Sequence, residues 1–257
     1  MTPTHQKTVF VTGASSGFGA AIVRLFAKRG ARVIAAARRL DRLQALAEEL
    51  GDNVLPLQLD VQDSQAVAKV VASLPADFAN IDHLVNNAGL ALGIEPAQNS
   101  ALVDWDRMID TNCRGLVHIT RAILPGMIER GSGHIVNLGS VAATYPYTGG
   151  NVYGATKAFV HQFSLNLRSD LHGTGVRVTC IEPGLCGGTE FSEVRLGGDK
   201  DKAAKIYAGA QPLIADDIAE TIAWAISLPE HVNINLIEMM PVSQSFAGFQ
   251  VHRRAAE

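Results

Sequence analysis

A tyrosine and a lysine four positions apart are the residues of this chain best suited to chemistry. Tyr153 and Lys157 bound the segment Tyr153-Gly154-Ala155-Thr156-Lys157, and on a helix this spacing puts both side chains on one face. A tyrosine phenol ordinarily loses its proton near pH ~10, so proton transfer at neutral pH requires a shift of roughly three units. One positive charge about 4 Å away supplies that shift at an effective dielectric constant of about 20. The pair is a candidate acid/base catalyst, although the same spacing also suits an ordinary pair on a helix surface.

A serine thirteen positions before the tyrosine is its candidate partner. Ser140 follows the apolar run 133–138 after a single glycine, and its hydroxyl there would hydrogen-bond a substrate carbonyl oxygen. A serine at such a place also forms turns or caps helices. A nucleophilic role is disfavoured, because no Gly-x-Ser-x-Gly elbow surrounds Ser140 and the eight histidines show no arrangement of a triad base.

Strand-like runs alternate with helical patterns and would position these side chains. The seven candidate strands cover residues 8–11, 32–37, 54–59, 83–85, 133–138, 176–181 and 234–239. Their connections are long enough for crossover helices, and their apolar centres fit strands covered on both faces. We therefore predict an α/β fold with a doubly wound parallel sheet, formed by residues 1–257 as a single domain. Residues 187–211, an irregular stretch with glycine pairs, are predicted to form a mobile lid.

A glycine-rich turn follows the first predicted strand and opens a helix over 20–29. Its glycines permit a tight turn and a close approach of backbone to a phosphate at the positive end of the helix. An ordinary βα turn is the alternative, but the strand before it and the helix after it favour dinucleotide binding. The predicted contacts from this turn are Gly13, Ala14, Ser15, Ser16, Gly17, Phe18 and Gly19.

The end of the second predicted strand bears on which dinucleotide binds. Arg38 and Arg39 stand there, where a carboxylate would accept hydrogen bonds from a ribose 2′-hydroxyl. Guanidinium groups bind phosphate oxygens in a bidentate fork, so the sequence predicts NADP rather than NAD. In the alternative, both arginines are solvated and Asp41 reaches the ribose. That alternative is disfavoured because Asp41 falls within the next predicted helix.

Two more segments end predicted strands and would line a nucleotide pocket. Asp60 and Val61 follow the third strand, and Asn87, Ala88 and Gly89 follow the fourth. Ligands of open parallel sheets collect at the carboxyl ends of the strands, which would put the aspartate beside the adenine and the small-residue turn beside the ribose. Asn86 or Asn87 can equally be a turn residue that bonds its own backbone.

In order and spacing these motifs resemble the short-chain dehydrogenase/reductase family over about residues 8–240. The matching residues are Thr12-Gly13-x-x-x-Gly17-x-Gly19, Asn86-Asn87-Ala88-Gly89, Asn112, Ser140, Tyr153-x-x-x-Lys157 and Pro183-Gly184. The resemblance implies a single Rossmann-type domain and a homotetramer, in which the C-terminal strand and residues 243–249 would pack at a subunit contact.

The resemblance also implies a catalytic tetrad of Asn112, Ser140, Tyr153 and Lys157. Tyr153 would be the general acid in reduction and the general base in oxidation, while Ser140 would hold and polarise the carbonyl. Lys157 would lower the tyrosine pKa and bind the nicotinamide ribose, and Asn112 would fix a water that links the lysine to solvent. The implied contacts to the cofactor near its nicotinamide are Tyr153, Lys157, Pro183, Gly184, Leu185, Gly188 and Thr189.

Residues 151–160, 182–192 and 233–241 resemble more closely the branch of NADP-dependent 3-hydroxy acid dehydrogenases. That branch oxidises serine, allo-threonine and other small 3-hydroxy acids and reduces malonic semialdehyde. Such substrates require a carboxylate anchor, for which we predict Arg195 with help from Tyr147, against a solvent-facing Arg195 or the rival Arg177. A reductase of neutral ketones or sugars, or a catalytically silent dinucleotide sensor, are the alternative functions.

Composition limits the partners and the cellular location that the sequence allows. A net charge of -3 and a pI of about 6.2 give no general attraction to nucleic acid or to anionic membranes. The three cysteines, Cys113, Cys180 and Cys186, are scattered without metal-site or disulfide spacing, so we expect reduced thiols, no metal and a cytoplasmic location. The first seven residues lack the apolar core of a signal peptide, and no apolar run is long enough to span a bilayer.

Overall fold

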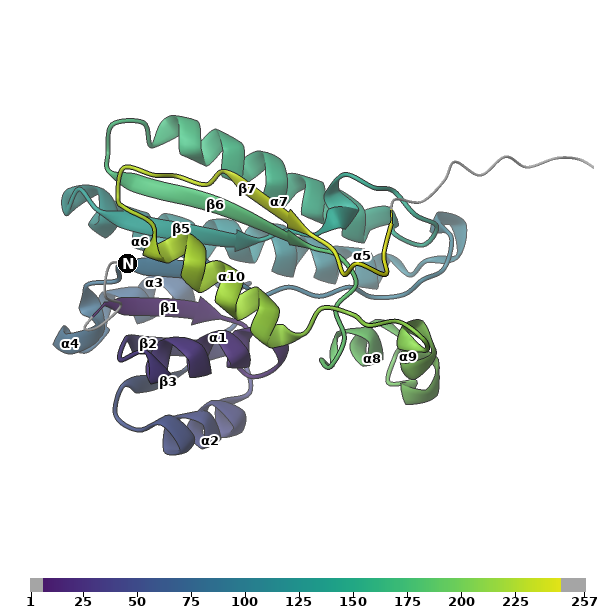
Figure 1. Ribbon diagram of the computed structural model, residues 1–257. Coiled ribbons are helices and arrows are strands. Elements are labelled where there is room, and N and C mark those ends of the chain that lie inside the picture. The colour runs from purple at the N-terminus through teal and green to yellow at the C-terminus, as the bar shows by residue number, and fades with distance from the viewer. Residues whose placement is uncertain (1–6, 246–257) are drawn as a thin grey trace, which may run out of the picture.

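The computed structural model describes residues 7–245 (Figure 1). Most of the predicted subunit-contact segment 243–249, and all but the last residue of the segment tested for a signal peptide, lie outside that range. No helix within 7–245 combines the length and the apolar character needed to cross a membrane. The same residues include no group of three or more His, Cys, Asp or Glu side chains arranged to hold a metal ion.

One parallel sheet of seven strands runs through the molecule in the order β3-β2-β1-β4-β5-β6-β7 (Figure 1). Its strands are β1 (Thr8–Thr12), β2 (Arg32–Ala37), β3 (Val54–Gln58), β4 (His83–Asn86), β5 (Gly133–Leu138), β6 (Val176–Pro183) and β7 (Leu236–Met239). The order reverses between β1 and β4, and ligands of such sheets bind beside that switch point. The predicted α/β doubly wound sheet of seven strands is confirmed, with one end of five strands shifted by one or two residues.

Helices cover both faces of the sheet. They are α1 (Gly17–Lys28), α2 (Leu40–Leu50), α3 (Ser64–Ala72), α4 (Ala76–Ala79), α5 (Leu102–Ile109), α6 (Leu116–Glu129), α7 (Asn151–Asp170), α8 (Phe191–Arg195), α9 (Lys200–Tyr207) and α10 (Ala215–Ser227). A π-helical turn, η2 (Asp110–Gly115), joins α5 to α6, and two short 3₁₀ turns are η1 (Ala97–Asn99) and η3 (Val141–Ala143).

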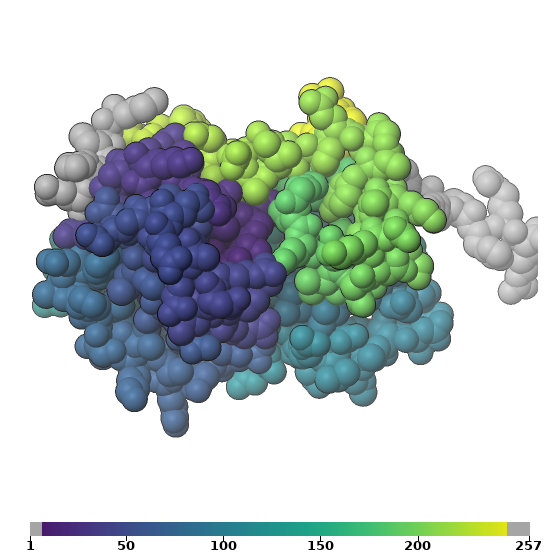
Figure 2. All heavy atoms as spheres, turned by 90° about the horizontal axis from the view of Figure 1, so that it is seen from below, coloured from purple at the N-terminus to yellow at the C-terminus, as the bar shows by residue number. Residues whose placement is uncertain are grey.

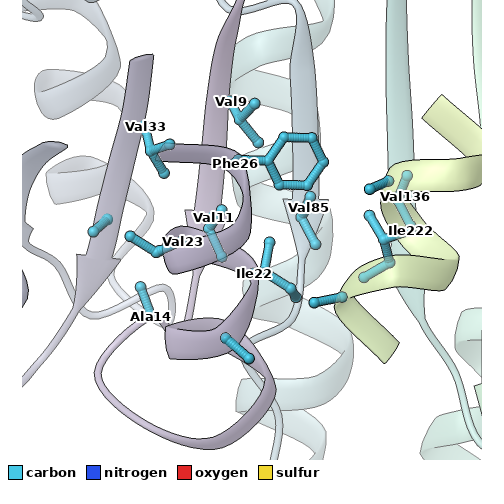
Figure 3. Close-up of a cluster of buried hydrophobic side chains, with 14 of the residues drawn as sticks. Val9, Val11, Ala14, Ile22, Val23, Phe26, Val33, Val85, Val136 and Ile222 are labelled. Atoms are coloured by element: carbon cyan, nitrogen blue, oxygen red, sulfur yellow. The ribbon is translucent and has the colours of Figure 1, made fainter. Parts of the chain in front are cut away.

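Each central strand sends alternate side chains into two cores. On one face, Val9 and Val11 of β1 pack with Ile22 and Phe26 of α1 and with Ile222 of α10 (Figure 3). On the other face, Phe10 joins a cluster that includes residues of α3, α6 and α7. Because both faces are covered, the side chains of these strands that fill the two cores are mainly apolar, as expected for a parallel sheet.

Two features differ from the sequence prediction. The first helix begins at Gly17 instead of residue 20, so that the last glycines of the turn are already helical. The segment 187–211 is not irregular, because it contains the short helices α8 and α9. Asp199 caps α9 by accepting a hydrogen bond from the backbone of Lys202, a local signal that glycine spacing alone does not carry.

Two buried histidines on β4 and β5 predict an acid-sensitive fold. His83 and His134 are register partners, and burial lowers the pKa of His83 from 6.5 to about 4 and that of His134 well below 6.5. Since both pKa values are depressed, the stability that the neutral rings give is complete above pH ~6.5 and is lost as the pH falls toward about 4. We expect the melting temperature to fall over that interval, and to fall less in His83→Leu, which cannot titrate there. An equal loss in both proteins would contradict the assignment.

Candidate active site

The glycine-rich turn lies at the carboxyl end of β1 and is held from the neighbouring strand. Gly13 has a φ of 66°, which favours glycine, and a side chain at Gly19 would collide with the Gly13 carbonyl oxygen. The Asn87 amide donates to the carbonyl oxygens of Thr12 and Gly13 at 2.9 and 3.2 Å. Asn87 therefore braces this turn, and its side chain is not the self-bonding turn residue of the alternative interpretation.

The N-terminus of α1 is arranged to receive an anion. Ser16, its N-cap residue, makes no side-chain cap hydrogen bond, and the first turn carries no acidic residue. The hydroxyls of Ser15 and Ser16 accept instead from Arg39, at 3.2 and 2.8 Å. The positive end of the helix dipole and the backbone donors of the turn thus face the site without a protein carboxylate on the helix to neutralise them.

Arg39 also reaches across to the segment predicted to be a lid. Its Nη1 donates to Glu190 at 3.0 Å, and Arg42 donates to the other oxygen of the same carboxylate at 2.7 Å. Arg42 and then Arg39 hold the pKa of Glu190 below its usual value. Arg38, by contrast, is exposed, so of the two predicted arginines only Arg39 is tied to the glycine-rich turn. Arg42 escaped the sequence analysis, although it is one helical turn beyond Arg39.

The remaining predicted cofactor contacts line the same edge of the sheet. Asp60 accepts from the backbone of Gln62 at 3.0 Å, and Val61 packs against Gly115. Ala88 faces the glycine-rich turn, while Gly89 lies beside Asn112 and Lys157. The positions after β6 also gather there, with the Leu185 backbone bound to Gln244 at 2.6 Å and Thr189 beside Gly17.

The lid residues and the glycine-rich turn line an open pocket of about 700 Å³. Its walls include Ser15, Ser16 and Gly17 on one side and Gly188, Thr189 and Tyr207 on the other. In Figure 2 the green lid residues lie beside the purple N-terminal residues along this edge.

Helix α7 and the turn after β5 bring the two predicted catalytic hydroxyls together. Ser140 is the N-cap residue of η3, where its hydroxyl accepts from the Ala142 backbone at 3.1 Å, and it is close enough to the Tyr153 phenol to lower the pKa of that group. Gly154 allows this approach, because a Cβ there would already lie 3.1 Å from the Ala142 carbonyl oxygen. Lys157 donates to the Leu138 carbonyl oxygen at 2.7 Å, and its Nζ lies 5.9 Å from the centre of the Tyr153 ring. Both are on one face of a helix, as the spacing predicted.

The electrostatics of the pair differ from the sequence expectation. Burial raises the pKa of Tyr153 to about 12, against the opposing effects of Ser140 and Arg195. Burial also lowers the pKa of Lys157 to about 8. The sequence argument expected the lysine charge alone to bring the pKa of the Tyr153 phenol near neutral pH. It does not, because desolvation disfavours the charged forms of both side chains.

Asn112 lies in the π-helical turn and holds the backbone near the site. Its amide exchanges hydrogen bonds with the backbone of Leu90 at 2.8 and 2.9 Å and donates to Thr156 at 3.0 Å. Thr156 in turn donates to the Tyr153 carbonyl oxygen at 2.8 Å. Thr156 thus connects two predicted tetrad members, and the sequence analysis missed it although it lies inside the Tyr-Gly-Ala-Thr-Lys segment.

Arg195, at the end of α8, lies over the Tyr153 ring. Its guanidinium carbon is 5.6 Å from the centre of the Tyr153 ring and 5.3 Å from that of Tyr147. It donates through Nε and Nη2 to the carbonyl oxygens of Gly93 and Gly149 at 3.0 and 3.1 Å, and its Nη1 makes no hydrogen bond to residues 7–245. Arg195 is thus placed at the site and is not a solvent-facing lid residue.

Two other residues weighed in the sequence analysis lie away from the chemistry. Arg177 donates to carbonyl oxygens at the end of α10, including that of Ile226 at 2.9 Å, so it is no substrate anchor. Cys186 packs at the edge of the core, and burial raises the pKa of its thiol to about 12. That thiol is protonated at neutral pH, in agreement with a packing role.

Known proteins similar to this chain share most of its length. An NADP-dependent 3-hydroxy acid dehydrogenase, YdfG, of Salmonella typhi is 62% identical over 245 residues, which cover 95% of this chain and 99% of that protein. A serine 3-dehydrogenase of Agrobacterium fabrum is 57% identical over 248 residues, covering 96% of this chain and 99% of that protein.

The fold and the family agree with these relatives. A solved structure of the closed form of serine dehydrogenase complexed with NADP+ superimposes with a TM-score of 0.95 at 61% identity, over 96% of this chain and 100% of that chain. The family model for short chain dehydrogenases matches residues 7–196. This chain therefore belongs to the short chain dehydrogenase family.

Proposed function

We propose that this chain is an NADP-dependent dehydrogenase of small 3-hydroxy acids of the serine type, working reversibly between the hydroxy acid and the 3-oxo acid. The observation that carries the substrate class is the Arg195 guanidinium over the Tyr153 ring, 5.6 Å from its centre. A carboxylate bound there by the arginine fork would hold the neighbouring hydroxyl carbon close to the phenol. The names of the relatives at 62% and 57% identity support the same class.

The residues at the edge of the sheet fit the dinucleotide. A Cβ at Gly13 would lie 2.9 Å from Ala88 Cα, so the glycines keep open a backbone cradle beside the uncapped start of α1. Gly13 to Gly19 would hold the diphosphate, Arg39 with Arg38 the 2′-phosphate, and Asp60 and Val61 the adenine side. When bound, NADP supplies the carbon that accepts or gives the hydride.

In the proposed mechanism the chain's own side chains handle binding and protons. Ser140 donates a hydrogen bond to the substrate oxygen, and Tyr153 takes the substrate proton in oxidation or returns it in reduction. The Lys157 ammonium and Arg195 favour the phenolate by their charge. Asn112 and Lys157 flank Gly89, where a Cβ would lie 3.3 and 3.6 Å from their polar atoms, which supports a proton route through a water at this point.

The predicted lid keeps its place in this proposal as residues 187–211. It is fastened to the rest of the molecule at two points, by Glu190 to Arg39 and Arg42, and by Arg195 to Gly93 and Gly149. Opening both would widen the pocket, and closing both would exclude water from Tyr153. A homotetramer, a cytoplasmic location and one domain over 1–257 complete the proposal.

The direct test is to mix the purified protein with NADP and serine and follow the absorbance of reduced cofactor. Turnover with serine or 3-hydroxypropionate is expected. A protein that binds NADPH but shows no turnover with any hydroxy acid would instead be a silent sensor. Turnover confined to neutral ketones or sugars, tested in the same substrate panel, would favour the alternative reductase.

A cofactor prediction follows from the hydrogen bonds of Arg39. Arg39→Ala is expected to raise the Kd for NADPH by roughly 10- to 100-fold and to change the Kd for NADH little, since each lost hydrogen bond to a charged group is worth about 1.5–3 kcal/mol. Fluorescence titration measures both constants, and Arg121→Ala, which removes an exposed arginine of α6, is the control. Wild-type protein that binds NADH more tightly than NADPH would refute the assignment of the 2′-phosphate site.

A further inference from the structure

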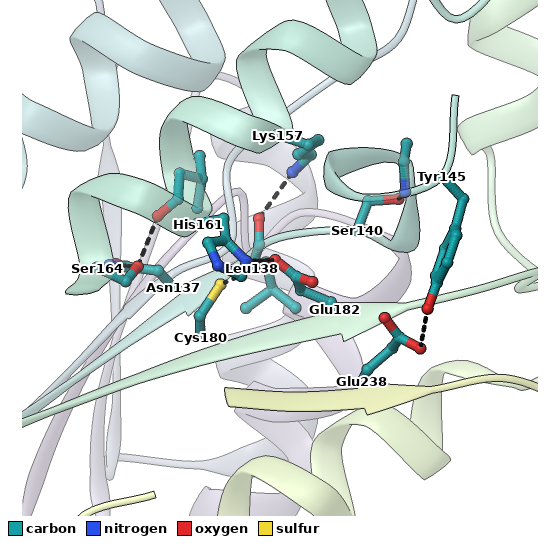
Figure 4. A network of polar contacts seen from close by, with 12 residues as sticks. Asn137, Leu138, Ser140, Tyr145, Lys157, His161, Ser164, Cys180, Glu182 and Glu238 are labelled. Atoms are coloured by element: carbon teal, nitrogen blue, oxygen red, sulfur yellow. Dashed lines mark hydrogen bonds and ion pairs between the residues drawn. The ribbon is translucent and has the colours of Figure 1, made fainter. Parts of the chain in front are cut away.

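The polar face of α7 continues beyond the catalytic pair. Tyr153, Lys157 and His161 follow one another at intervals of four residues, so they form a single stripe on the helix. The last of them, His161, is bonded through Nδ1 to Glu182 Oε1 of β6 at 2.7 Å (Figure 4). None of the roles assigned above uses this carboxylate.

Glu182 and Lys157 are a distinctive pair within the described part of the chain. Among residues 7–245, Glu182 is the one buried carboxylate, with no exposed surface, and Lys157 is the one buried lysine, at 7% exposure. Burying an isolated charge costs several kcal/mol or more, so each of these groups requires compensation. Lys157 forms no salt bridge with a carboxylate in that range.

Lys157 and Glu182 contact two adjacent residues, Leu138 and Gly139, which lie just before Ser140. Lys157 bonds the Leu138 carbonyl oxygen, and the next residue, Gly139, lies against the carboxylate. A Cβ at Gly139 would be 2.8 Å from Glu182 Cγ and 3.1 Å from Oε1. Gly139 immediately precedes Ser140 and is itself fixed by a hydrogen bond to Ile181 at 2.7 Å. The acid is therefore packed directly behind the turn that carries the serine.

The carboxylate is only half satisfied by hydrogen bonds. Oε1 is shared by His161 and, at 3.7 Å, by the thiol of Cys180, whereas Oε2 is buried without a hydrogen-bond partner in 7–245. An unpaired acid in a structural core is costly, and replacing it by an apolar side chain would remove that cost. The other titratable groups that face Glu182 or Lys157 are Cys180 on β6, Glu238 on β7, Tyr145 after η3, Cys113 in η2, and Tyr153 and His161 on α7.

We propose that Glu182, held by His161, is the counter-charge that keeps Lys157 protonated during turnover, and thus a positioning residue for the reaction. The inference rests on the proposed function, because it assigns Lys157 its role in that reaction. Through-space attraction suffices for this role, since two opposite charges separated by one backbone segment in a water-poor interior still interact strongly.

Among the groups that raise the pKa of Lys157, only Glu182 carries a negative charge at working pH. After the lowering by burial, the groups that raise the pKa of Lys157 are Cys180, Cys113 and Glu182. Burial raises the pKa of the Cys180 thiol to about 12 and that of Cys113 to about 11, so both thiols are neutral at working pH. Burial also raises the pKa of Glu182, but the His161 hydrogen bond opposes that rise.

The test is the pH profile of kcat/KM for hydroxy acid oxidation in Glu182→Gln. This change keeps the shape and removes the charge, so Lys157 loses its proton at lower pH and the alkaline limb of the profile is expected to move down by about one pH unit. Glu238→Gln is the matched control, because it removes an exposed carboxylate from the register partner of Glu182 on β7. Its profile should coincide with that of the wild type.

The outcomes separate a charge effect from a packing effect. A profile of Glu182→Gln that is lower at every pH but unmoved would overturn the proposal, because a structural role predicts that result. Glu182→Asp, which retains the charge, should keep the wild-type limb even where its rate is lower, and a shifted limb there would also count against it. Wild-type turnover in the same assay tests the proposed function separately, since failure of that function leaves no profile to compare.

Discussion

Tyr153→Phe is expected to lower kcat by roughly 10²- to 10⁴-fold, the usual contribution of a positioned general acid or base. The change removes one oxygen from a side chain that is 8% exposed and leaves the ring that packs against Ala142 and Met108. Since the ring also lies 5.9 Å from that of Phe191, the lid contact is preserved. The loss should therefore appear in the chemical step and not in the fold.

Cofactor binding provides the control for that result. The Kd of Tyr153→Phe for NADPH should stay within a few-fold of the wild type, because Arg39 and the glycine-rich turn are untouched. Full turnover in this variant would return Tyr153 and Lys157 to an ordinary pair on a helix. A large rise in the Kd with kcat unchanged would make the phenol a binding group instead.

The proposed acid/base pair, Tyr153 and Lys157, cannot be understood from its two members alone. Burial drives the pKa of Tyr153 up to about 12 and that of Lys157 down to about 8, which is opposite to what catalysis requires of both. Charges outside the motif must offset desolvation, and the structure offers Arg195 over the Tyr153 ring and Glu182 behind Gly139. The spacing of four residues brings the pair together, and residues distant in sequence adjust its electrostatics.

Local patterns explain why the fold was predictable. Strands β2 and β5 have the predicted bounds, because apolar, β-branched runs between turns are unambiguous when helices cover both faces. The glycine-rich turn and the polar residues at strand ends were identified for a similar reason, since parallel strands deliver their carboxyl ends to one edge. The lid was harder to predict, as α8 has five residues and carries no periodic signal of its own.

Contacts between distant segments explain what the sequence did not reveal. Glu190 meets Arg42 across 148 positions, and Glu182 meets His161 across 21. Nothing local marks either acid, because a glutamate in a lid usually faces solvent and one at a strand end is usually exposed. Thr156 was missed for another reason. Its hydroxyl bonds Asn112 and the Tyr153 carbonyl oxygen, and the sequence analysis assigned roles to both of those residues without involving the threonine.

Binding of the substrate carboxylate should depend on Arg195 more than on any other side chain of the lid. Arg195→Gln is expected to raise KM for serine or 3-hydroxypropionate by roughly 10- to 100-fold, because a charge-assisted bond to a carboxylate is worth about 1.5–3 kcal/mol. KM for a neutral alcohol of the same length should change little. Steady-state kinetics at saturating NADP measure both constants in one preparation.

Lid movement needs its own control, since Arg195 also fastens the lid to Gly93 and Gly149. Glu190→Gln weakens the other fastening, to Arg39 and Arg42, without touching the substrate side, so it should affect charged and neutral substrates alike. The ratio of the two KM values then isolates recognition from closure. If Arg195→Gln changed both constants by the same factor, the arginine would serve only as a lid clasp and the 3-hydroxy acid assignment would lose its anchor.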